Sequence, residues 1–472
     1  MKRSIVISLG VLMVILASWT VLAKHGTGYH RVCDMSFLEQ AWTTKGYESK
    51  LPLLDWRDYG GINYMSPVGD QDWTGRCWCF ASLHCLESLI KIDQYPPMFN
   101  QDFSEDAMED CMTYGIESHW RAAAYLSALG PVLESCQGWT PSYPSCLSCP
   151  QQDYRLRDMI TIAETTAAIK AALEDGPVMC AIESEGTSMG ASIGGYDGSF
   201  VLTDGPAAGI DHAVLIVGYH EGTGDPGYLD GNYWICKNSW GSDWGDNGYF
   251  YIQYGAASIG TDPVQFINWE PSLANQSKVL LYEDDGGVGA SVNPGAGHNY
   301  YYICQRLMPT MDGTLVGVQW ANFGNNFNWM VRVYDDMAGG TPQTMLSSIS
   351  GNNEPHGGLI EKDLTTPVAL TTGDPIYICI QLHNPTSTLH PIDVTGPYSG
   401  YAYNSDTSIV GSYTENSADL IPYDWSVRGI MLEPGVPTPT APPETPATGP
   451  AGIGIVLLAL GGLIGLSAIR KR

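Results

Sequence analysis

An α+β fold followed by an all-β sandwich is the fold class that the sequence predicts, and three observations support it. Apolar residues recur at helical spacing over residues 77–90, which predicts a helix that begins at a cysteine. Apolar runs at 212–219 and 233–236 predict two buried strands. Over residues 272–434, short strand-like runs alternate with Gly, Asn, Asp and Pro turns, which is typical of an antiparallel β-sandwich.

The predicted helix places Cys77 at its N-terminus, directly after a turn at Gly75. At that position the unsatisfied backbone amides and the helix dipole favour a thiolate. Cys79 and Cys85 lie deeper in the same helix, and we expect them to be buried small hydrophobes or disulfide partners. Cys77 is therefore the candidate nucleophile.

Two later stretches supply the groups that a nucleophilic cysteine needs. His212 begins the first predicted strand and Asn238 follows the second, 135 and 161 residues after Cys77. An imidazole takes the thiol proton, a side-chain amide orients the imidazole, and the indole of Trp240 is expected to shield their hydrogen bond. Gln71, six residues before the cysteine, is placed to donate an amide N–H to an oxyanion. The pattern predicts nucleophilic catalysis by a cysteine–histidine pair.

These residues resemble the papain family of cysteine peptidases over residues 51–271. The motifs that carry the resemblance are Leu54-Asp55-Trp56-Arg57, Pro67-Val68-x-x-Gln71, Cys77-Trp78, Asp211-His212-Ala213 and Asn238-Ser239-Trp240-Gly241. The resemblance implies a two-lobed fold, with a mainly helical lobe, a β-barrel-like lobe and the active site between them. It also implies hydrolysis of protein or peptide substrates through a covalent acyl-enzyme, with no cofactor and no metal.

The resemblance also implies a role for each matched residue. Cys77 corresponds to the nucleophile and His212 to the general base and acid. Asn238 corresponds to the residue that orients the histidine, and Gln71 to the oxyanion donor. Neighbouring residues of the same motifs are expected to contact the substrate, namely Arg76, Trp78, Asp211, Ala213 and Trp240.

The motif before the cysteine departs from the family pattern. Thr74 and Arg76 stand where the family usually has a cysteine and a serine. The usual disulfide partner of that missing cysteine corresponds to Cys111, which pairs with Cys79, pairs with Cys85 or stays a thiol. Arg76 either lowers the pKa of the neighbouring thiol, projects into the cleft and biases substrate choice, or is a solvated surface residue.

Two further departures concern substrate and control. The family's usual Gly-Gly pair along the cleft is replaced by Ile116-Glu117. The segment of residues 24–50 is much shorter than the inhibitory propeptide that the family usually carries. The substrate preference and the means of restraint therefore stay open.

Twelve cysteines in an exported chain predict disulfides. Cys136, Cys146 and Cys149 lie in one Gly/Pro/Ser-rich loop, and we expect a bridge that staples this loop. A zinc site at Cys146 and Cys149 is the weaker alternative, because no second ligand pair accompanies them. Cys304 and Cys379 occupy similar strand-like settings, so they either bridge two strands or are buried thiols.

Both ends of the sequence predict attachment to the cell surface. Residues 1–23 have a basic start, an apolar run and a small-residue end, which is the pattern of a secretory signal peptide. Residues 435–449 form a Pro/Thr-rich linker, and residues 450–472 form an apolar span with a basic tail. We therefore expect a single-pass membrane protein whose catalytic domain is extracellular. Pro446-Ala447-Thr448-Gly449 also resembles a sortase signal, so sortase processing stays open beside a retained span.

The composition limits the class of partner. Acidic residues outnumber basic residues by 50 to 22, which gives a net charge of −28 and makes nucleic acid an improbable partner. The length of 472 residues is consistent with two folded domains between the leader and the linker. We place them at residues 51–271 and 272–434.

The second domain looks like the lectin-like domain that follows papain-like domains in some surface proteins of archaea and bacteria. Stacking on glycan rings and burial in the core are both open for its aromatic residues, and core is the preferred interpretation. The acidic turns at residues 283–285 and 335–336 either bind Ca²⁺ or are solvated. The aromatic residues concerned are Trp320, Phe323, Phe327 and Trp329.

Three functions remain compatible with the sequence. A cell-surface cysteine endopeptidase is favoured because each catalytic role has a residue in the expected place. A catalytically idle adhesin that binds glycan or protein is the first alternative. A Cys-His acyltransferase is the second, although such an enzyme is not expected to carry the Gln71 and Asn238 motifs.

Overall fold

The structure is a computed structural model that describes Tyr29 and much of residues 53–437. The predicted leader, the predicted membrane span and the linker beyond residue 437 lie outside the described residues, and no described helix has the length and apolar character needed to cross a bilayer. Within 53–437 the gaps in the description are residues 95–100, 112–116, 143–144, 186–195, 206–208, 226, 274–275, 277, 282–289, 293–299, 325–326, 339–340, 384–389, 394–401, 406–413, 416–423 and 426.

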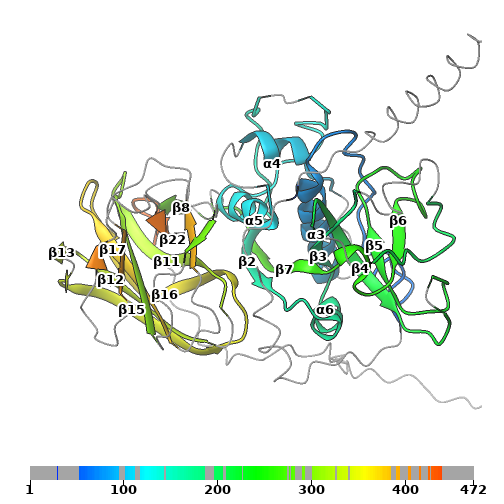
Figure 1. Ribbon diagram of the computed structural model, residues 1–472. Helices are drawn as coiled ribbons and strands as arrows, with labels where there is room; N and C mark the ends of the chain where they lie inside the picture. Colours follow the sequence, from blue (N-terminus) through cyan, green and yellow to red (C-terminus); the bar gives the residue numbers. More distant parts are fainter. Residues whose placement is uncertain are drawn as a thin grey trace, which may run out of the picture. The chain divides into compact units, whose positions relative to one another are not determined.

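Four α-helices are described in the first half of the chain (Figure 1). The predicted helix α3 (Cys77–Asp93) is confirmed, and it packs against strand β4 (His212–His220) and helix α5 (His119–Ala128). Two helices have side-chain caps that explain where they begin: Ser118 accepts from the backbone of Arg121 before α5, and Thr165 caps the last helix in the same way. The other two helices are α4 (Glu105–Cys111) and α6 (Thr166–Leu173).

The strands of the first half belong to an 11-stranded sheet in the order β6-β5-β4-β3-β7-β2-β16-β11-β22-β8, with β1 paired to β4. Both strands predicted from the apolar runs are present, as β4 and β5. The members that precede residue 272 are β1 (Leu53–Asp55), β2 (Arg155–Thr161), β3 (Val178–Ile182), β4 (His212–His220), β5 (Tyr233–Lys237), β6 (Tyr249–Ile252) and β7 (Thr261–Glu270), and a 3₁₀ turn (Ala256–Ser258) precedes β7.

The same sheet continues into the second half of the chain. Strand β2 pairs antiparallel with β16 through Met159 opposite Leu359 and Ile160 opposite Gly358. The sequence predicts two separate domains, whereas the structure joins them through this shared sheet. The members after residue 272 are β8 (Lys278–Leu281), β11 (Gly313–Asn322), β16 (Gly358–Leu370) and β22 (Val427–Leu432).

A second sheet of six strands covers this part and completes the predicted β-sandwich. Its order is β15-β12-β17-β10-β19-β20, and all of its pairings are antiparallel. Apolar side chains from both layers form one core, for example Val331 and Ile378 with Val318 and Ile360. The strands are β10 (Tyr300–Leu307), β12 (Phe327–Tyr334), β15 (Met345–Glu354), β17 (Ile376–His383), β19 (Ala402–Ser405) and β20 (Thr414–Glu415).

Two small sheets complete the description of the second half. The small sheets comprise β13 (Met337–Ala338) with β14 (Thr341–Pro342), and β9 (Ala290–Val292) with β18 (His390–Asp393) and β21 (Asp424–Trp425).

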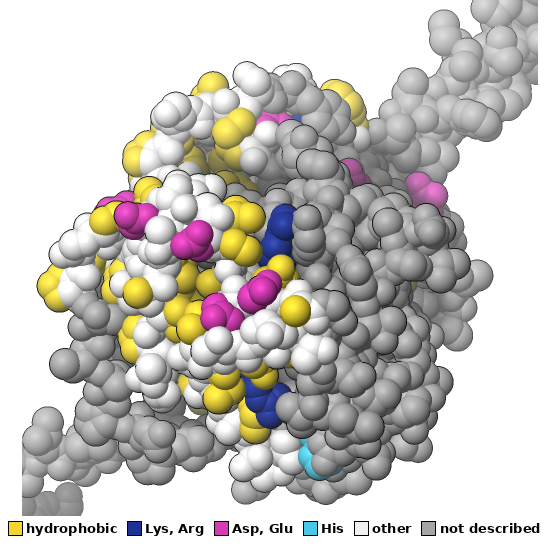
Figure 2. Space-filling model, turned by 90° about the vertical axis from the view of Figure 1, so that its left-hand side faces the viewer, with side chains coloured by type: hydrophobic (Ala, Val, Ile, Leu, Met, Phe, Trp, Pro, Cys, Tyr) yellow, Lys and Arg dark blue, Asp and Glu magenta, His cyan; other side chains and the backbone are white. Residues whose placement is uncertain are grey.

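On the face of the molecule that Figure 2 shows, apolar, acidic and a few basic side chains are interspersed among the described residues, and the basic ones form no continuous patch there.

The aromatic residues of the sandwich are mostly core, as the sequence analysis preferred. Trp320, Phe323 and Phe327 are each 0% exposed, so they do not stack on a sugar in this structure. Trp329 is half-buried and packs on Trp320. The acidic turn at residues 335–336 accepts backbone N–H groups of its own hairpin, while residues 283–285 lie outside the described part.

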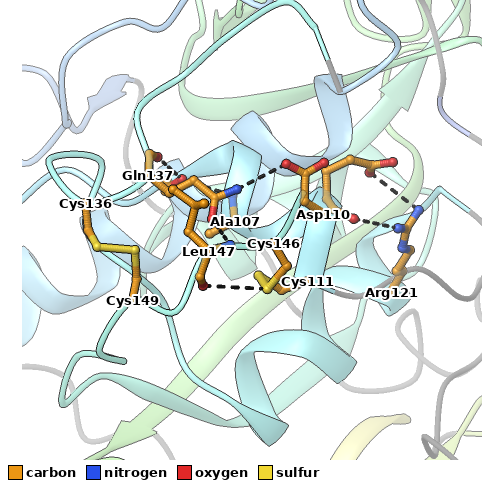
Figure 3. Close-up of a disulfide and its surroundings, with 11 residues drawn as sticks. Ala107, Asp110, Cys111, Arg121, Cys136, Gln137, Cys146, Leu147 and Cys149 are labelled. Carbon is orange, nitrogen blue, oxygen red and sulfur yellow. Dashed lines mark hydrogen bonds and ion pairs between the residues drawn. A yellow bond between two sulfur atoms is a disulfide. The ribbon is translucent and has the colours of Figure 1, made fainter. Parts of the chain in front are cut away.

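Three disulfides are formed among the described cysteines. Cys136 bonds to Cys149 and Cys111 bonds to Cys146, so two bridges staple the loop that was expected to carry one (Figure 3). The suggestion that Cys111 pairs with a cysteine of α3 is wrong, because Cys146 holds it. The zinc alternative is wrong for the same reason, since both proposed ligand thiols are consumed. Another disulfide joins β10 to β17 through residues 304 and 379.

Candidate active site

Cys77 is the first residue of α3 and its side chain is 0% exposed. The preceding residue, Arg76, makes no side-chain hydrogen bond that caps the helix. The partial positive charge of the helix N-terminus therefore acts on the Cys77 thiol without competition from a capping side chain, which favours the thiolate.

The imidazole of His212 is held by Asn238. Nε2 of His212 lies 2.8 Å from Oδ1 of Asn238, and that oxygen also accepts the backbone N–H of Ser239 at 2.8 Å. An amide oxygen only accepts, so Nε2 carries the proton and Nδ1 is the basic nitrogen of the neutral ring. Among the described residues Nδ1 has no hydrogen-bond partner.

Trp240 shields this hydrogen bond. Its indole stacks on the His212 ring at a centroid distance of 5.0 Å, and Trp244 packs edge-on against the indole, also at 5.0 Å. Burial lowers the pKa of His212, while the Asn238 hydrogen bond and the Asp211 charge act in the opposite direction. A neutral imidazole, ready to accept a proton, is the favoured form.

Gln71 is fixed on three sides. Its backbone N–H donates to the Ser239 carbonyl at 2.8 Å, and its side-chain Oε1 accepts from the Ser239 hydroxyl at 2.5 Å. Its amide Nε2 donates one hydrogen to the Thr74 carbonyl at 2.7 Å. An amide nitrogen carries two hydrogens, and the bond to Thr74 uses one of them.

Arg76 is not the solvated residue that one alternative expected. Its side chain is 2% exposed and pairs with Asp106, and a second carboxylate, Asp110, lies 3.5 Å away. Its guanidinium also lies over the Trp139 ring, 5.3 Å from the centroid. A buried guanidinium needs such partners, and these partners replace solvent. We therefore assign Arg76 to this acidic cluster rather than to the groups that meet a substrate.

The other residues expected to contact substrate are also largely buried. Trp78 and Ala213 are 0% and 1% exposed, so both are core residues in this structure. The Trp78 ring lies under the guanidinium of Arg121 at 4.8 Å. Asp211 is half-buried, and its carboxylate accepts the backbone N–H groups of residues 184 and 185.

The remaining thiols of this region differ from Cys77 in position. Cys79 and Cys85 are buried within α3, and Cys180 and Cys236 lie in strands β3 and β5. Burial raises the pKa of each of them, to about 12 for Cys85 and Cys180. They are inert small hydrophobes, one of the two outcomes expected for the α3 pair.

Two residues that support the site, Ser239 and Lys237, were not predicted from the sequence. The hydroxyl of Ser239 holds Gln71, as described above. Lys237, one residue before Asn238, donates to the backbone carbonyls of Ser66 and Pro67 at 2.9 and 2.7 Å. Their only sequence signal was adjacency to Asn238, because the partners lie about 170 residues away along the chain.

Comparisons with known proteins agree with this geometry. Residues 52–266 match the family described as papain family cysteine protease. Ananain of Ananas comosus is 26% identical over 223 residues, which cover 45% of this chain and 60% of ananain. Pro-cathepsin H of Mus musculus is 31% identical over 217 residues, which cover 44% of this chain and 61% of that protein. The matched part therefore spans about three-fifths of the length of these relatives.

The similarity to solved structures extends over both halves of the chain. The cysteine protease and lectin-like domains of Cwp84, a surface layer associated protein of Clostridium difficile, superpose with a TM-score of 0.66 at 16% identity. The match covers 90% of this chain and 96% of that structure. At this identity the likeness shows the fold, namely a papain-like α+β domain joined to a further β-sheet domain.

Proposed function

Because residues 52–266 form a papain-family cysteine protease domain, we propose that the protein is a cysteine endopeptidase in which Cys77 and His212 carry the reaction. The observation that carries this proposal is the hydrogen bond between His212 Nε2 and Asn238 Oδ1, which reserves Nδ1 for the thiol proton. The position of Cys77 at the first residue of α3 supports the nucleophile role.

Acylation follows from these roles. The Cys77 thiol gives its proton to His212 Nδ1, and the thiolate sulfur attacks the carbonyl carbon of a peptide bond. The carbonyl oxygen then becomes an oxyanion, which the Cys77 backbone N–H and the side-chain amide of Gln71 stabilise. When this intermediate collapses, the C–N bond breaks and the leaving amine takes the proton from Nδ1. A thioester to Cys77 remains.

Deacylation reverses the proton path. A water molecule gives a proton to His212 Nδ1 as its oxygen attacks the thioester carbon. The C–S bond breaks, the carboxylic acid product leaves, and the sulfur recovers its proton from the imidazolium. The side chain of Asn238 keeps the ring oriented through both steps, and no metal or redox partner is needed.

The test combines labelling with turnover. The full chain is incubated with a thiol-directed epoxide and with a panel of fluorogenic peptides, and wild type is compared with Cys77→Ala. We expect turnover and labelling in wild type and neither in Cys77→Ala. Cys85→Ala is the matched control, because that buried thiol lies in the same helix and is expected to leave both signals in place. Glycan binding without labelling would favour an adhesin, and isopeptide products with an added amine would favour an acyltransferase.

We further propose that the enzyme works outside the cell. The leader pattern of residues 1–23 and the apolar segment of residues 450–472 support export and anchoring. The disulfides formed among the described cysteines support an oxidising compartment. Protease treatment of intact cells tests this location: the catalytic domain should be degraded, whereas a cytoplasmic marker should survive.

A further inference from the structure

One side chain of the N-terminal segment is buried beside the active site. Tyr29 is 2% exposed, and its backbone N–H donates to the carbonyl of Asp211 at 3.2 Å. Its ring lies 4.8 Å from the His119 ring, centroid to centroid, and its hydroxyl donates to the carboxylate of Asp262. The chain's own tyrosine is thus held by its backbone, its ring and its hydroxyl, one residue away from His212.

The groups that hold Tyr29 come from separate elements. His119 is the first residue of α5, Asp211 directly precedes β4, and Asp262 is the second residue of β7. Strand β3 lies between β4 and β7 in the sheet, so the groups that contact Tyr29 come from one helix and from the starts of two strands that are not neighbours. Only the folded protein brings these residues together, and the sequence offered no motif for them.

Asp262, which contacts the Tyr29 hydroxyl, combines burial with a left-handed backbone conformation. It is 1% exposed, and its φ of 50° lies in the left-handed region, which costs energy for any residue other than glycine. Its backbone N–H donates to Glu164 at 2.9 Å, which helps to hold this conformation. A buried carboxylate is costly unless donors reach it, and the Tyr29 hydroxyl is such a donor.

His119, which lies against the Tyr29 ring, carries no charge at neutral pH. Burial lowers the pKa of His119 to about 3, so its imidazole is neutral. Its Nδ1 lies 3.5 Å from the Ser82 hydroxyl. The neutral His119 ring and the Asp262 carboxylate together suit an aromatic side chain that ends in a hydrogen-bond donor.

We propose that His119, Asp262 and the Asp211 carbonyl form a substrate side-chain pocket that selects tyrosine over phenylalanine, and that Tyr29 occupies this pocket in the present state. The proposal rests on the peptidase function above, whose substrate class it specifies. A substrate tyrosine would repeat the three contacts of Tyr29. Because Tyr29 belongs to the same chain, a substrate must compete with it at high effective concentration.

The first test measures selectivity in the full chain carrying Tyr29→Ala. Peptides with either one tyrosine or one phenylalanine are scanned over the three positions before the scissile bond. We expect kcat/KM to favour tyrosine about tenfold or more at one position, since a hydrogen bond to a charged group is lost with phenylalanine. Asp262→Asn should shrink this ratio, whereas Asp175→Asn, a matched change of an acid outside the site, should not. A ratio of two rates is insensitive to partial misfolding.

The second test measures binding and does not require turnover. In the full chain with Cys77→Ala and Tyr29→Ala, the tyrosine peptide should bind about tenfold more tightly than the phenylalanine peptide, and restoring Tyr29 should weaken its binding. Equal affinities, or a preference for lysine or arginine peptides, would overturn the pocket proposal. Selective binding without hydrolysis by any variant would keep the pocket and overturn the peptidase function.

Discussion

In the proposed mechanism, the hydrogen bond from His212 Nε2 to Asn238 decides which ring nitrogen takes part in proton transfer. Without it the neutral ring can carry its proton on Nδ1, which then cannot accept the thiol proton. The stacked indole of Trp240 restricts the same ring. Orientation and tautomer of His212 are thus set by two residues of one turn.

Replacement of Asn238 tests this role. We expect Asn238→Ala to lower kcat about 100-fold while KM changes little, because the substrate does not contact Asn238 and the proton transfer loses its oriented base. Steady-state kinetics and epoxide labelling at several pH values provide the measurement. Asn268→Ala, a change on β7, is the control. An unchanged kcat in Asn238→Ala would contradict the orienting role.

A second prediction at this scale concerns stability against pH. Burial lowers the pKa of His119 from its ordinary 6.5 to about 3. Between these two pH values, His119 is protonated in the unfolded chain but not in the folded chain. The free energy of unfolding is therefore highest, as far as His119 is concerned, above pH 6.5, and it decreases as the pH falls toward 3. The loss is about 1.4 kcal/mol per pH unit. Denaturant unfolding of wild type and His119→Gln between pH 7.5 and 4.5 isolates it.

The comparison with the variant is needed because other buried groups act in the opposite sense. Burial raises the pKa of Glu87 to about 7, so that carboxyl group favours the folded state more as pH falls through this range. The difference between wild type and His119→Gln cancels such contributions. Parallel curves for the two proteins would contradict the prediction.

Several residues of the site could be predicted from the sequence, and others could not. Cys77, His212 and Asn238 lie where periodicity and turn chemistry place them: at a helix start, at a strand start and after a strand. The role of Arg76 could not be predicted, because its carboxylate partners on α4 lie 30 and 34 residues away in sequence. The pocket around Tyr29 depends on residues that share no local pattern.

At the scale of elements, an ion pair anchors the start of α3. Arg76 precedes the helix and pairs with Asp106 on α4, whose carboxylate is 0% exposed. Asp106 also accepts the backbone N–H and the hydroxyl of Thr140. This cluster connects α3 to α4 and to the loop that carries the two disulfides. Thr74 stands where the family usually has a disulfide-forming cysteine, so the start of α3 is held by this cluster and not by a disulfide.

Removal of one partner of the Arg76–Asp106 ion pair should lower the stability of the folded protein. Arg76→Met leaves a buried carboxylate without its cation, and we expect a loss of about 3–5 kcal/mol in the free energy of unfolding. The double variant Arg76→Met with Asp106→Leu should recover most of this loss. Urea unfolding of the four proteins in the cycle gives the coupling energy. Additive losses in the double variant would argue against a direct pair.

Helices and strands with strong periodicity, such as α3 and β4, followed from the sequence. The disulfide between Cys111 and Cys146 did not, because connectivity depends on which loops meet in space. The continuation of β2 into β16 did not follow either, since sheet pairing between distant strands leaves no local signal.

At the scale of the whole molecule, the papain-like half and the sandwich are joined by more than a linker. Arg155 on β2 pairs with Glu361 on β16, and both side chains are almost fully buried. Arg428 on β22 donates to the Ser127 hydroxyl and the Ala124 carbonyl of α5. Backbone pairing and buried ion contacts thus cross between the two halves.

Gly358 is the position where this junction is most easily broken. A Cβ there would lie 1.7 Å from the Met159 carbonyl oxygen, and its φ of +140° also disfavours a side chain. We expect Gly358→Val to split one calorimetric unfolding transition into two. Gly373→Val is the control, because it also has a positive φ but no neighbouring atom within 4 Å. A single transition in Gly358→Val would show that the two halves unfold together without this pairing.

The shared sheet also has a consequence for aggregation. If the chain were cut between the papain-like half and the sandwich and the parts separated, β2 would become an edge strand with unpaired N–H and C=O groups. Such an edge recruits strands from other molecules. The papain-like half produced alone is therefore expected to be prone to insoluble assembly, because the sandwich no longer covers the edge of β2.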